Sequence, residues 1–190
     1  MIRIFKLTCR DLCMNVPFLL LLLALMGVLC FVTDGASTIF LLYIILTPAF
    51  VMNTEFPNGS LKLVASLPVT RAQIVLSKYL SSYVIIGALA AVSFLSSRIS
   101  GEAFSLPGPI LLCVLTVHAI LMLGQFILLR YSPVAFLVSM VAGFGSVFAI
   151  QALLGEGTGQ FSFLPYLWGG LGIQCISCAL SILIFQRKKI

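Results

Sequence analysis

Charged residues are scarce in this sequence. Asp, Glu, Lys and Arg make up only 8% of the chain, whereas a soluble domain carries roughly 25%. Hydrophobic residues make up 61% of the 190 residues, and the mean hydropathy is +1.20. This composition excludes a soluble globular protein and predicts an integral membrane protein.

Acidic residues are the rarer of the two charged classes, which leaves a net charge of +6. A nucleic-acid-binding protein would present its basic residues on one face of a soluble domain, together with stacking aromatic residues. Because the sequence offers no such domain, we attribute the positive charge to membrane topology and to anionic lipid. We therefore expect membrane lipid, and no nucleic acid, among the partners.

Motifs that carry chemistry are also missing. No GxxxxGK[ST] phosphate-binding loop occurs in the sequence, so the chain cannot hydrolyse ATP by itself. The six cysteines have no metal-site spacing, and the pair Cys175 and Cys178 falls within an apolar stretch, where cysteine packs as a small hydrophobic residue. We expect no catalytic residue, no metal and no cofactor on this chain.

Long apolar stretches dominate the sequence instead. A helix needs about 20 mostly apolar residues to cross a hydrocarbon core of about 30 Å. Stretches of this kind predict an all-α, polytopic membrane protein with six transmembrane helices in a single transmembrane domain, residues 1–190. The six predicted spans are Leu12–Val32, Ala36–Met52, Leu80–Ser97, Pro109–Leu129, Pro133–Leu154 and Tyr166–Phe185.

The basic residues predict the orientation of these spans. If both termini share a side with the loops after the second and fourth spans, every basic residue except Arg98 lies on that side. Such an asymmetry marks the cytoplasmic side. We therefore expect a multi-pass protein of the cell membrane with cytoplasmic N- and C-termini. The residues on the predicted cytoplasmic side are Arg3, Lys6, Arg10, Lys62, Arg71, Lys78, Arg130, Arg187, Lys188 and Lys189.

The N-terminal sequence "MIRIFKLTCRDLC" has helical amphipathicity. Its basic residues share one face and its apolar residues the other. This pattern predicts a helix over residues 2–13 that lies in the plane of the membrane surface. The basic face consists of Arg3, Lys6 and Arg10, and the apolar face of Ile2, Phe5, Cys9 and Leu12.

Inside the predicted spans, titratable groups are almost absent. No Asp, Glu, Lys or Arg lies in the middle of a span, so the buried carboxylate typical of proton- or sodium-coupled carriers is missing. His118 lies in the fourth span, and Gln125 follows seven residues later on the same helical face. These two side chains could contact a polar substrate along its path, or His118 could hydrogen-bond to a neighbouring helix. Both interpretations remain open at this point.

The segment "NGSLKLVASLPVTRAQIVLSKYL", residues 58–80, is the one long patterned stretch outside the predicted spans. Its first part is bounded by the turn sequence "PNG" and by Pro68, which disfavours helix at the preceding residue. This leaves a two-turn helix over Gly59–Leu67, too short to be stable alone in water. Because most of its surface is apolar, we expect it to bind in a groove of another protein. Its apolar residues are Leu61, Leu63, Val64, Ala65 and Leu67.

The second part of the segment predicts a firmly started helix. Thr70 and Gln73 have the spacing of a capping box, and Val69 with Ile74 the spacing of a hydrophobic staple. From Arg71 the helix can continue without a break into the third span. Any movement of the short helix would therefore be transmitted directly into the membrane.

These residues resemble the cytoplasmic loop of the membrane permeases of type 2 ATP-binding-cassette (ABC) exporters. The resemblance consists of Glu55, Gly59, an apolar turn and the run "SLPVTRAQIVLSKYL", together with six spans and a basic N-terminal helix. It implies that residues 59–67 are a coupling helix docked on an ATPase subunit, and that residues 2–12 are a connecting helix. The implied docking residues are Glu55, Gly59, Leu61, Leu63, Val64, Leu67 and Arg71.

The same resemblance implies an assembly and an activity. Two permease chains, identical or different, would associate with two copies of a separate ATPase subunit that binds ATP and Mg²⁺. The complex would export its substrate, such as a peptide, an antimicrobial or a lipid-like molecule, by alternating access. The connection "GEGTGQFSFLP" before the last span is shorter than the re-entrant element of large lipid and polysaccharide exporters. The alternative function is a small carrier or channel that works without an ATPase.

Overall fold

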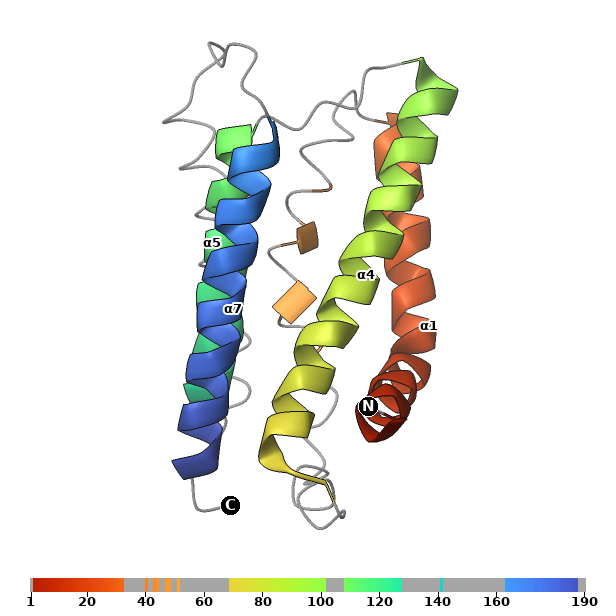
Figure 1. The fold of residues 1–190 in the computed structure, drawn as a ribbon. Helices are drawn as coiled ribbons and strands as arrows, with labels where there is room; N and C mark the ends of the chain where they lie inside the picture. Colours follow the sequence, from red (N-terminus) through yellow and green to blue (C-terminus); the bar gives the residue numbers. More distant parts are fainter. Residues whose placement is uncertain are drawn as a thin grey trace.

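A computed structural model of the chain describes residues 2–32, 69–101, 108–127 and 163–187, and also residues 40, 43, 44, 47, 48, 51 and 141. All secondary structure in this part of the chain is helical, which confirms the predicted all-α class for it (Figure 1). The helices are α1 (Ile2–Val32), α4 (Arg71–Ser100), α5 (Gly108–Ile127) and α7 (Phe163–Arg187).

The long helices overlap the predicted spans in residue range. The stretches Arg71–Ile99 in α4 and Pro165–Arg187 in α7 are long and apolar enough to cross a membrane, and the apolar stretch Leu111–Ile127 of α5 is shorter. They correspond to the predicted third, sixth and fourth spans, and α1 contains the first. Most of the second and fifth predicted spans lies outside the described residues, so the number of six spans stays a prediction.

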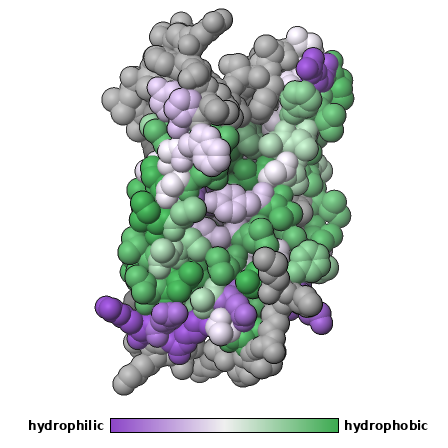
Figure 2. All heavy atoms as spheres, in the orientation of Figure 1, coloured by the Kyte–Doolittle hydropathy of each residue, from purple (hydrophilic) through white to green (hydrophobic). Residues whose placement is uncertain are grey.

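The four described helices run in two opposite directions. In Figure 1, α1 and α4 run away from the end where the N-terminus lies, and α5 and α7 run back to that end, where the C-terminus also lies. Hydrophilic residues gather at this lower end in Figure 2, and hydrophilic surface is also visible at the opposite end. Arg98, in the last turn of α4, belongs to that opposite end. The basic residues of the lower end include Lys6, Arg10, Arg71, Lys78 and Arg187.

Between the two ends, large apolar side chains point outward from every helix. Each of five such residues has more than half of its surface exposed. Figure 2 shows that hydrophobic residues form a band between the two ends. In water an apolar band of this extent would be unfavourable, whereas hydrocarbon solvates it. The outer surface of the bundle is therefore suited to lipid. The five residues are Leu20, Leu25, Leu95, Ile120 and Ile176.

The N-terminal region forms one continuous helix in the structure, which includes both the predicted surface helix and the first predicted span. Helix α1 contains Pro17, and a proline inside a helix removes one hydrogen bond and produces a kink. In Figure 1 the first turns of α1 run at an angle to the rest of the helix. These turns bury Leu7 and Thr8 against the protein and leave Phe5 66% exposed. On the predicted apolar face, Phe5 is therefore accessible to lipid. The position of these first turns in the plane of the membrane surface stays a prediction.

The interior packs in two helix pairs that meet along α4 and α7. Helix α1 packs along α4, α5 packs along α7, and α4 also contacts α7. An apolar cluster lies between α4, α5 and α7 near the end that holds the termini. The rings of Tyr79 and Phe126 are parallel with centroids 6.4 Å apart, and Phe126 meets Phe185 edge to face at 5.8 Å. The cluster consists of Ile74, Val75, Tyr79, Met122, Phe126 and Phe185.

Six further buried residues belong to the region of the predicted second span. All are helical, and their spacing of three or four residues places them on one face of a helix. The hydroxyl of Thr47 donates to the carbonyl of Tyr43 at 2.8 Å, as expected within a helix. This stretch therefore contributes one buried face to the interior. The six residues are Phe40, Tyr43, Ile44, Thr47, Pro48 and Val51.

Gly170 allows α7 to approach α5 closely. A Cβ atom at this position would lie 2.4 Å from Cδ1 of Leu115, whereas a Cβ at Gly172 would meet no atom within 4 Å. We expect Gly170→Ala to lower the free energy of unfolding by about 1–3 kcal/mol, because the two helices must move apart. Gly172→Ala is the matched control and should be neutral or slightly stabilising, since alanine favours helix. Unfolding by SDS titration in mixed micelles measures both, and equal stabilities would contradict the close packing.

Candidate coupling and substrate-path residues

The start of α4 has the cap that the sequence predicts. The amide of Gln73 donates to the hydroxyl oxygen of Thr70 at 3.3 Å, and the amide of Thr70 donates to the side-chain oxygen of Gln73 at 3.0 Å. Both halves of the capping box are therefore present. Val69 packs against the apolar cluster that includes Ile74, as the staple predicts. Helix α4 then continues unbroken to Ser100, which confirms the continuous helix.

The cap should contribute measurably to stability. We expect Thr70→Ala to lower the free energy of unfolding by about 1 kcal/mol, because the amide of Gln73 loses its acceptor. Thr70→Ser retains the oxygen and should cost much less. SDS titration compares the two variants, and a loss of the same size in both would show that the methyl group of Thr70, and not its hydroxyl, provides the stabilisation.

Arg71 connects the start of α4 to the end of α7. Its Nη1 donates to the carbonyl oxygens of Phe185 and Gln186 at 3.1 and 3.0 Å, and its guanidinium carbon lies 6.0 Å from the centre of the Phe185 ring. The last carbonyls of a helix have no partner within it and carry partial negative charge, so a guanidinium stabilises them. The predicted contact of Arg71 with an ATPase is a separate matter and stays a prediction.

The other predicted docking residues lie outside the described part of the chain. The same holds for the glycine-rich connection before the last span and for any re-entrant element in it. The coupling helix over residues 59–67 therefore stays a prediction from the sequence. The docking residues concerned are Glu55, Gly59, Leu61, Leu63, Val64 and Leu67.

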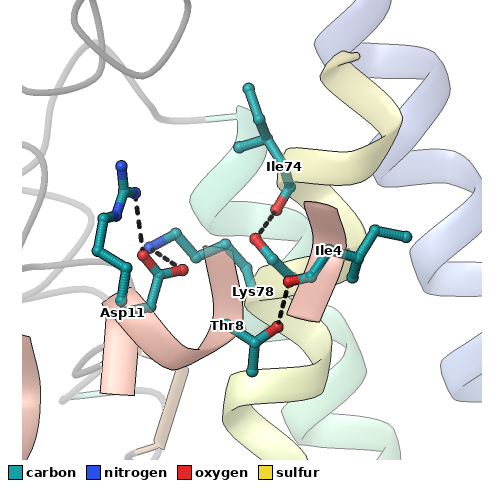
Figure 3. Close-up of polar contacts among 7 residues, drawn as sticks. Ile4, Thr8, Asp11, Ile74 and Lys78 are labelled. Atoms are coloured by element: carbon teal, nitrogen blue, oxygen red, sulfur yellow. Dashed lines mark hydrogen bonds and ion pairs between the residues drawn. The ribbon is translucent and has the colours of Figure 1, made fainter. Parts of the chain in front are cut away.

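A buried ion pair that the sequence does not predict joins α1 to α4. The Nζ of Lys78 lies 3.1 Å from Oδ2 of Asp11, and the two side chains are 3% and 2% exposed. Figure 3 shows them pointing toward one another from the two helices. Oδ1 of Asp11 accepts a hydrogen bond from Nη2 of Arg10 at 3.1 Å. The ammonium of Lys78 and the carboxylate of Asp11 are close enough for an ion pair, but their geometry is not that of a hydrogen bond. Electrostatic attraction therefore holds the two groups together.

The sequence contains a weak signal for this pair. Asp11 is the one acidic residue in a basic N-terminal segment, and Lys78 comes two turns after the start of a long, mostly apolar helix. The positive-inside pattern places Lys78 among the basic residues of the predicted cytoplasmic side and says nothing of a partner for it. Their burial against one another follows from the packing of α1 on α4, which the sequence does not reveal.

His118 hydrogen-bonds to the helices on either side of it. Its side chain is completely buried. Nε2 lies 2.8 Å from the hydroxyl oxygen of Ser82 on α4, and Nδ1 lies 2.8 Å from Nε2 of Gln174 on α7. The amide nitrogen of Gln174 also donates to the carbonyl of Leu115 at 2.9 Å. These contacts correspond to the second interpretation from the sequence, in which His118 hydrogen-bonds to a neighbouring helix.

The donors and acceptors define the state of the imidazole. An amide nitrogen can only donate, so Nδ1 of His118 accepts and carries no proton. The ring is therefore neutral, and its Nε2–H donates to the hydroxyl oxygen of Ser82. A neutral ring avoids placing a charge inside the bundle, where desolvation is costly.

A second polar group lies nearby between α4 and α7. The hydroxyl of Tyr79 lies 2.7 Å from that of Ser177 and 3.1 Å from that of Ser181, and Ser177 donates to the carbonyl of Ala119 at 2.7 Å. Together with the His118 contacts, these bonds join α4, α5 and α7. Small polar side chains of this kind strengthen helix contacts in membranes by roughly 1 kcal/mol each.

Gln125, the other candidate for the substrate path, is 4% exposed and lies on α5 with His118. Both side chains thus point into the protein and not toward lipid. Their contact with a substrate stays a prediction. Cys175 and Cys178 are free thiols on α7, and Cys178 packs against the apolar cluster. Within the described residues, no group of His, Cys, Asp and Glu has the arrangement of a metal site.

Comparison with known families gives a clear result. A model of the ABC-2 family transporter proteins matches residues 6–188, which is nearly the whole chain. The chain belongs to this family. It is a membrane permease of an ABC transporter, as its resemblance to type 2 ABC permeases implies. No curated protein and no solved structure gave a significant match.

Proposed function

We propose that this permease moves its substrate by alternating access, driven by a separate ATPase subunit that docks on the coupling helix over residues 59–67. Helix-in-groove binding fits the apolar surface of that short helix. Closure of the ATPase on ATP would push the coupling helix, and α4 would carry the displacement into the membrane.

The firm start of α4 is the observation that supports this proposal. Only Pro68, Val69 and Thr70 separate the predicted coupling helix, residues 59–67, from the first residue of α4. The capping box fixes the first turn, Arg71 attaches it to the end of α7, and Lys78 attaches it to α1. A force applied to the first turn of α4 would therefore displace the attached ends of α1, α4 and α7 together.

The proposed assembly contains two permease chains, identical or different, and two ATPase subunits that bind ATP and Mg²⁺. The end of the bundle that holds both termini and most basic residues would face the cytoplasm. The direction would be export from the cell, and the cargo a peptide, an antimicrobial or a lipid-like molecule. Surrounding anionic lipid would contact the basic residues of this end.

A pull-down from native membranes in mild detergent tests the docking. We expect an ATPase subunit to co-purify with the wild-type chain and to be lost with Val64→Asp, because a charge is costly to bury in an apolar groove. Ser105→Asp, on the loop predicted to lie outside the cell, is the matched control and should retain the ATPase. Co-purification with Val64→Asp at the wild-type level would contradict docking through this helix.

A carrier or channel that works without an ATPase is the second candidate. The buried polar side chains of α4, α5 and α7 are the observation in its favour, since polar side chains within a membrane often line a path. This candidate predicts that the wild-type chain purifies without any ATPase. His118 and Gln125 would then be the first residues to replace in a search for the substrate path.

A further inference from the structure

The buried ion pair between Asp11 and Lys78 carries an inference that rests on the proposed function. We propose that this pair is the joint that makes the first turns of α1 move with α4 when an ATPase displaces the coupling segment. Asp11 and Lys78 are then positioning residues of the transport cycle.

Stability alone does not account for the pair. Both charges are almost completely removed from water, at 2% and 3% exposure, and their mutual attraction has to offset the desolvation penalty of both ions. Two apolar side chains of similar volume at such a place are often as stable or more stable. A packed apolar contact depends on close complementarity of shape, whereas the attraction between opposite charges in a low-dielectric site extends over several ångströms.

The position of the pair matches such a joint. Lys78 lies two turns after the start of α4. It is therefore in the N-terminal part of the helix, close in sequence to the coupling segment. Asp11 lies in the third turn of α1, in the part that runs at an angle to the rest of that helix (Figures 1 and 3). On its other side, the start of α4 is attached to α7 through Arg71. The ion pair is thus the charged link between α4 and the N-terminal turns.

Arg10 allows this joint to move without leaving a bare carboxylate. Its guanidinium lies 3.1 Å from Oδ1 of Asp11, and its side chain is 34% exposed, so it reaches water while it contacts the buried carboxylate. If Lys78 shifts relative to Asp11 during the cycle, the carboxylate keeps a positive partner on its own helix. The contact can therefore stretch and re-form at a lower cost than an isolated buried pair.

Replacement of both Asp11 and Lys78 by apolar residues distinguishes a role in transmitting movement from a role in stability. The double variant Asp11→Leu, Lys78→Met removes both charges and retains their volume. Environment-sensitive fluorophores would be placed singly at Phe5→Cys on α1 and at Leu80→Cys on α4, after replacement of the six native cysteines by alanine. Phe5 and Leu80 are 66% and 42% exposed, so both sites accept a label. The probe is MgATP with vanadate, added to the complex with its co-purified ATPase in nanodiscs.

We expect both labels to respond to MgATP and vanadate when the ion pair is intact. In the double variant the label on α4 should still respond and the label on α1 should lose its response. An unchanged α1 response in the double variant would overturn the joint and leave the proposed function intact. If the ion pair is intact and the α4 label responds while the α1 label does not, the joint is also overturned and the proposed function is left intact. If neither label responds, the proposed function fails, and the joint with it.

A fold control accompanies the test. The double variant should elute as a single species with its ATPase and unfold in SDS at or above the wild-type concentration. If it does not fold, Lys78→Met alone replaces it, because Asp11 retains Arg10 in that variant. The α1 response should be lost there as well, and its persistence would overturn the joint.

Discussion

Replacement of Asp11 by alanine should lower the free energy of unfolding by about 3–5 kcal/mol, the largest loss expected from a single substitution at this end of the bundle. The reason is the ammonium group of Lys78, which is 3% exposed and lies 3.1 Å from the carboxylate. Without that carboxylate, the buried ammonium loses its ion-pair partner on α1, in a site that excludes water. SDS titration of the purified variants measures the loss.

Lys78→Met is the matched comparison. It removes the other member of the pair, but Asp11 keeps the guanidinium of Arg10 at 3.1 Å, and the methionine side chain fills the space of the lysine stem. The loss should therefore be clearly smaller than with Asp11→Ala. If the two variants lose the same free energy, Arg10 does not compensate the carboxylate, and the asymmetry that the geometry predicts is wrong.

His118→Ala should also lower the free energy of unfolding by about 3–5 kcal/mol. Removal of a fully buried ring leaves a cavity. It also takes a hydrogen-bond partner from Ser82 on α4 and from Gln174 on α7, and a buried polar group that loses its partner costs about 1–3 kcal/mol. SDS titration measures this loss, and limited proteolysis should show weaker association of α4 with α5 and α7.

Thr116→Val provides the control on the same helix. Thr116 donates only to the carbonyl of Leu112 in the preceding turn, at 2.8 Å, and valine has nearly the same shape. Its effect should stay below about 1 kcal/mol. A His118→Ala variant as stable as Thr116→Val would show that the polar contacts of the imidazole do not hold the three helices together.

Substrate transport separates the two possible roles of His118. If the ring acts only by joining helices, a variant that restores stability, such as a second-site revertant elsewhere in the bundle, should restore transport as well. Transport that stays low in a stable revertant would support a place for His118 on the substrate path.

The sequence alone determined the features that depend on local order. Scarce charge and long apolar stretches predicted a helical membrane protein, because hydrocarbon admits only spans that satisfy their own backbone. Thr70 and Gln73 predicted the start of α4, since a cap is a contact between residues three apart. The run that begins at Ser66 carried the resemblance to the family that the whole chain matches.

Only the tertiary structure decided which distant side chains meet. The partners Asp11 and Lys78 are far apart in the chain, and so are His118 and Gln174. Both pairs depend on which face of each helix turns inward and on how far each helix is shifted along its neighbour. A sequence of mostly apolar helices does not specify these quantities, because nearly every helix face is hydrophobic enough to pack against another helix or to face lipid. Packing of whole helices therefore placed Lys78, which looked like an ordinary cytoplasmic charge, in the interior beside Asp11.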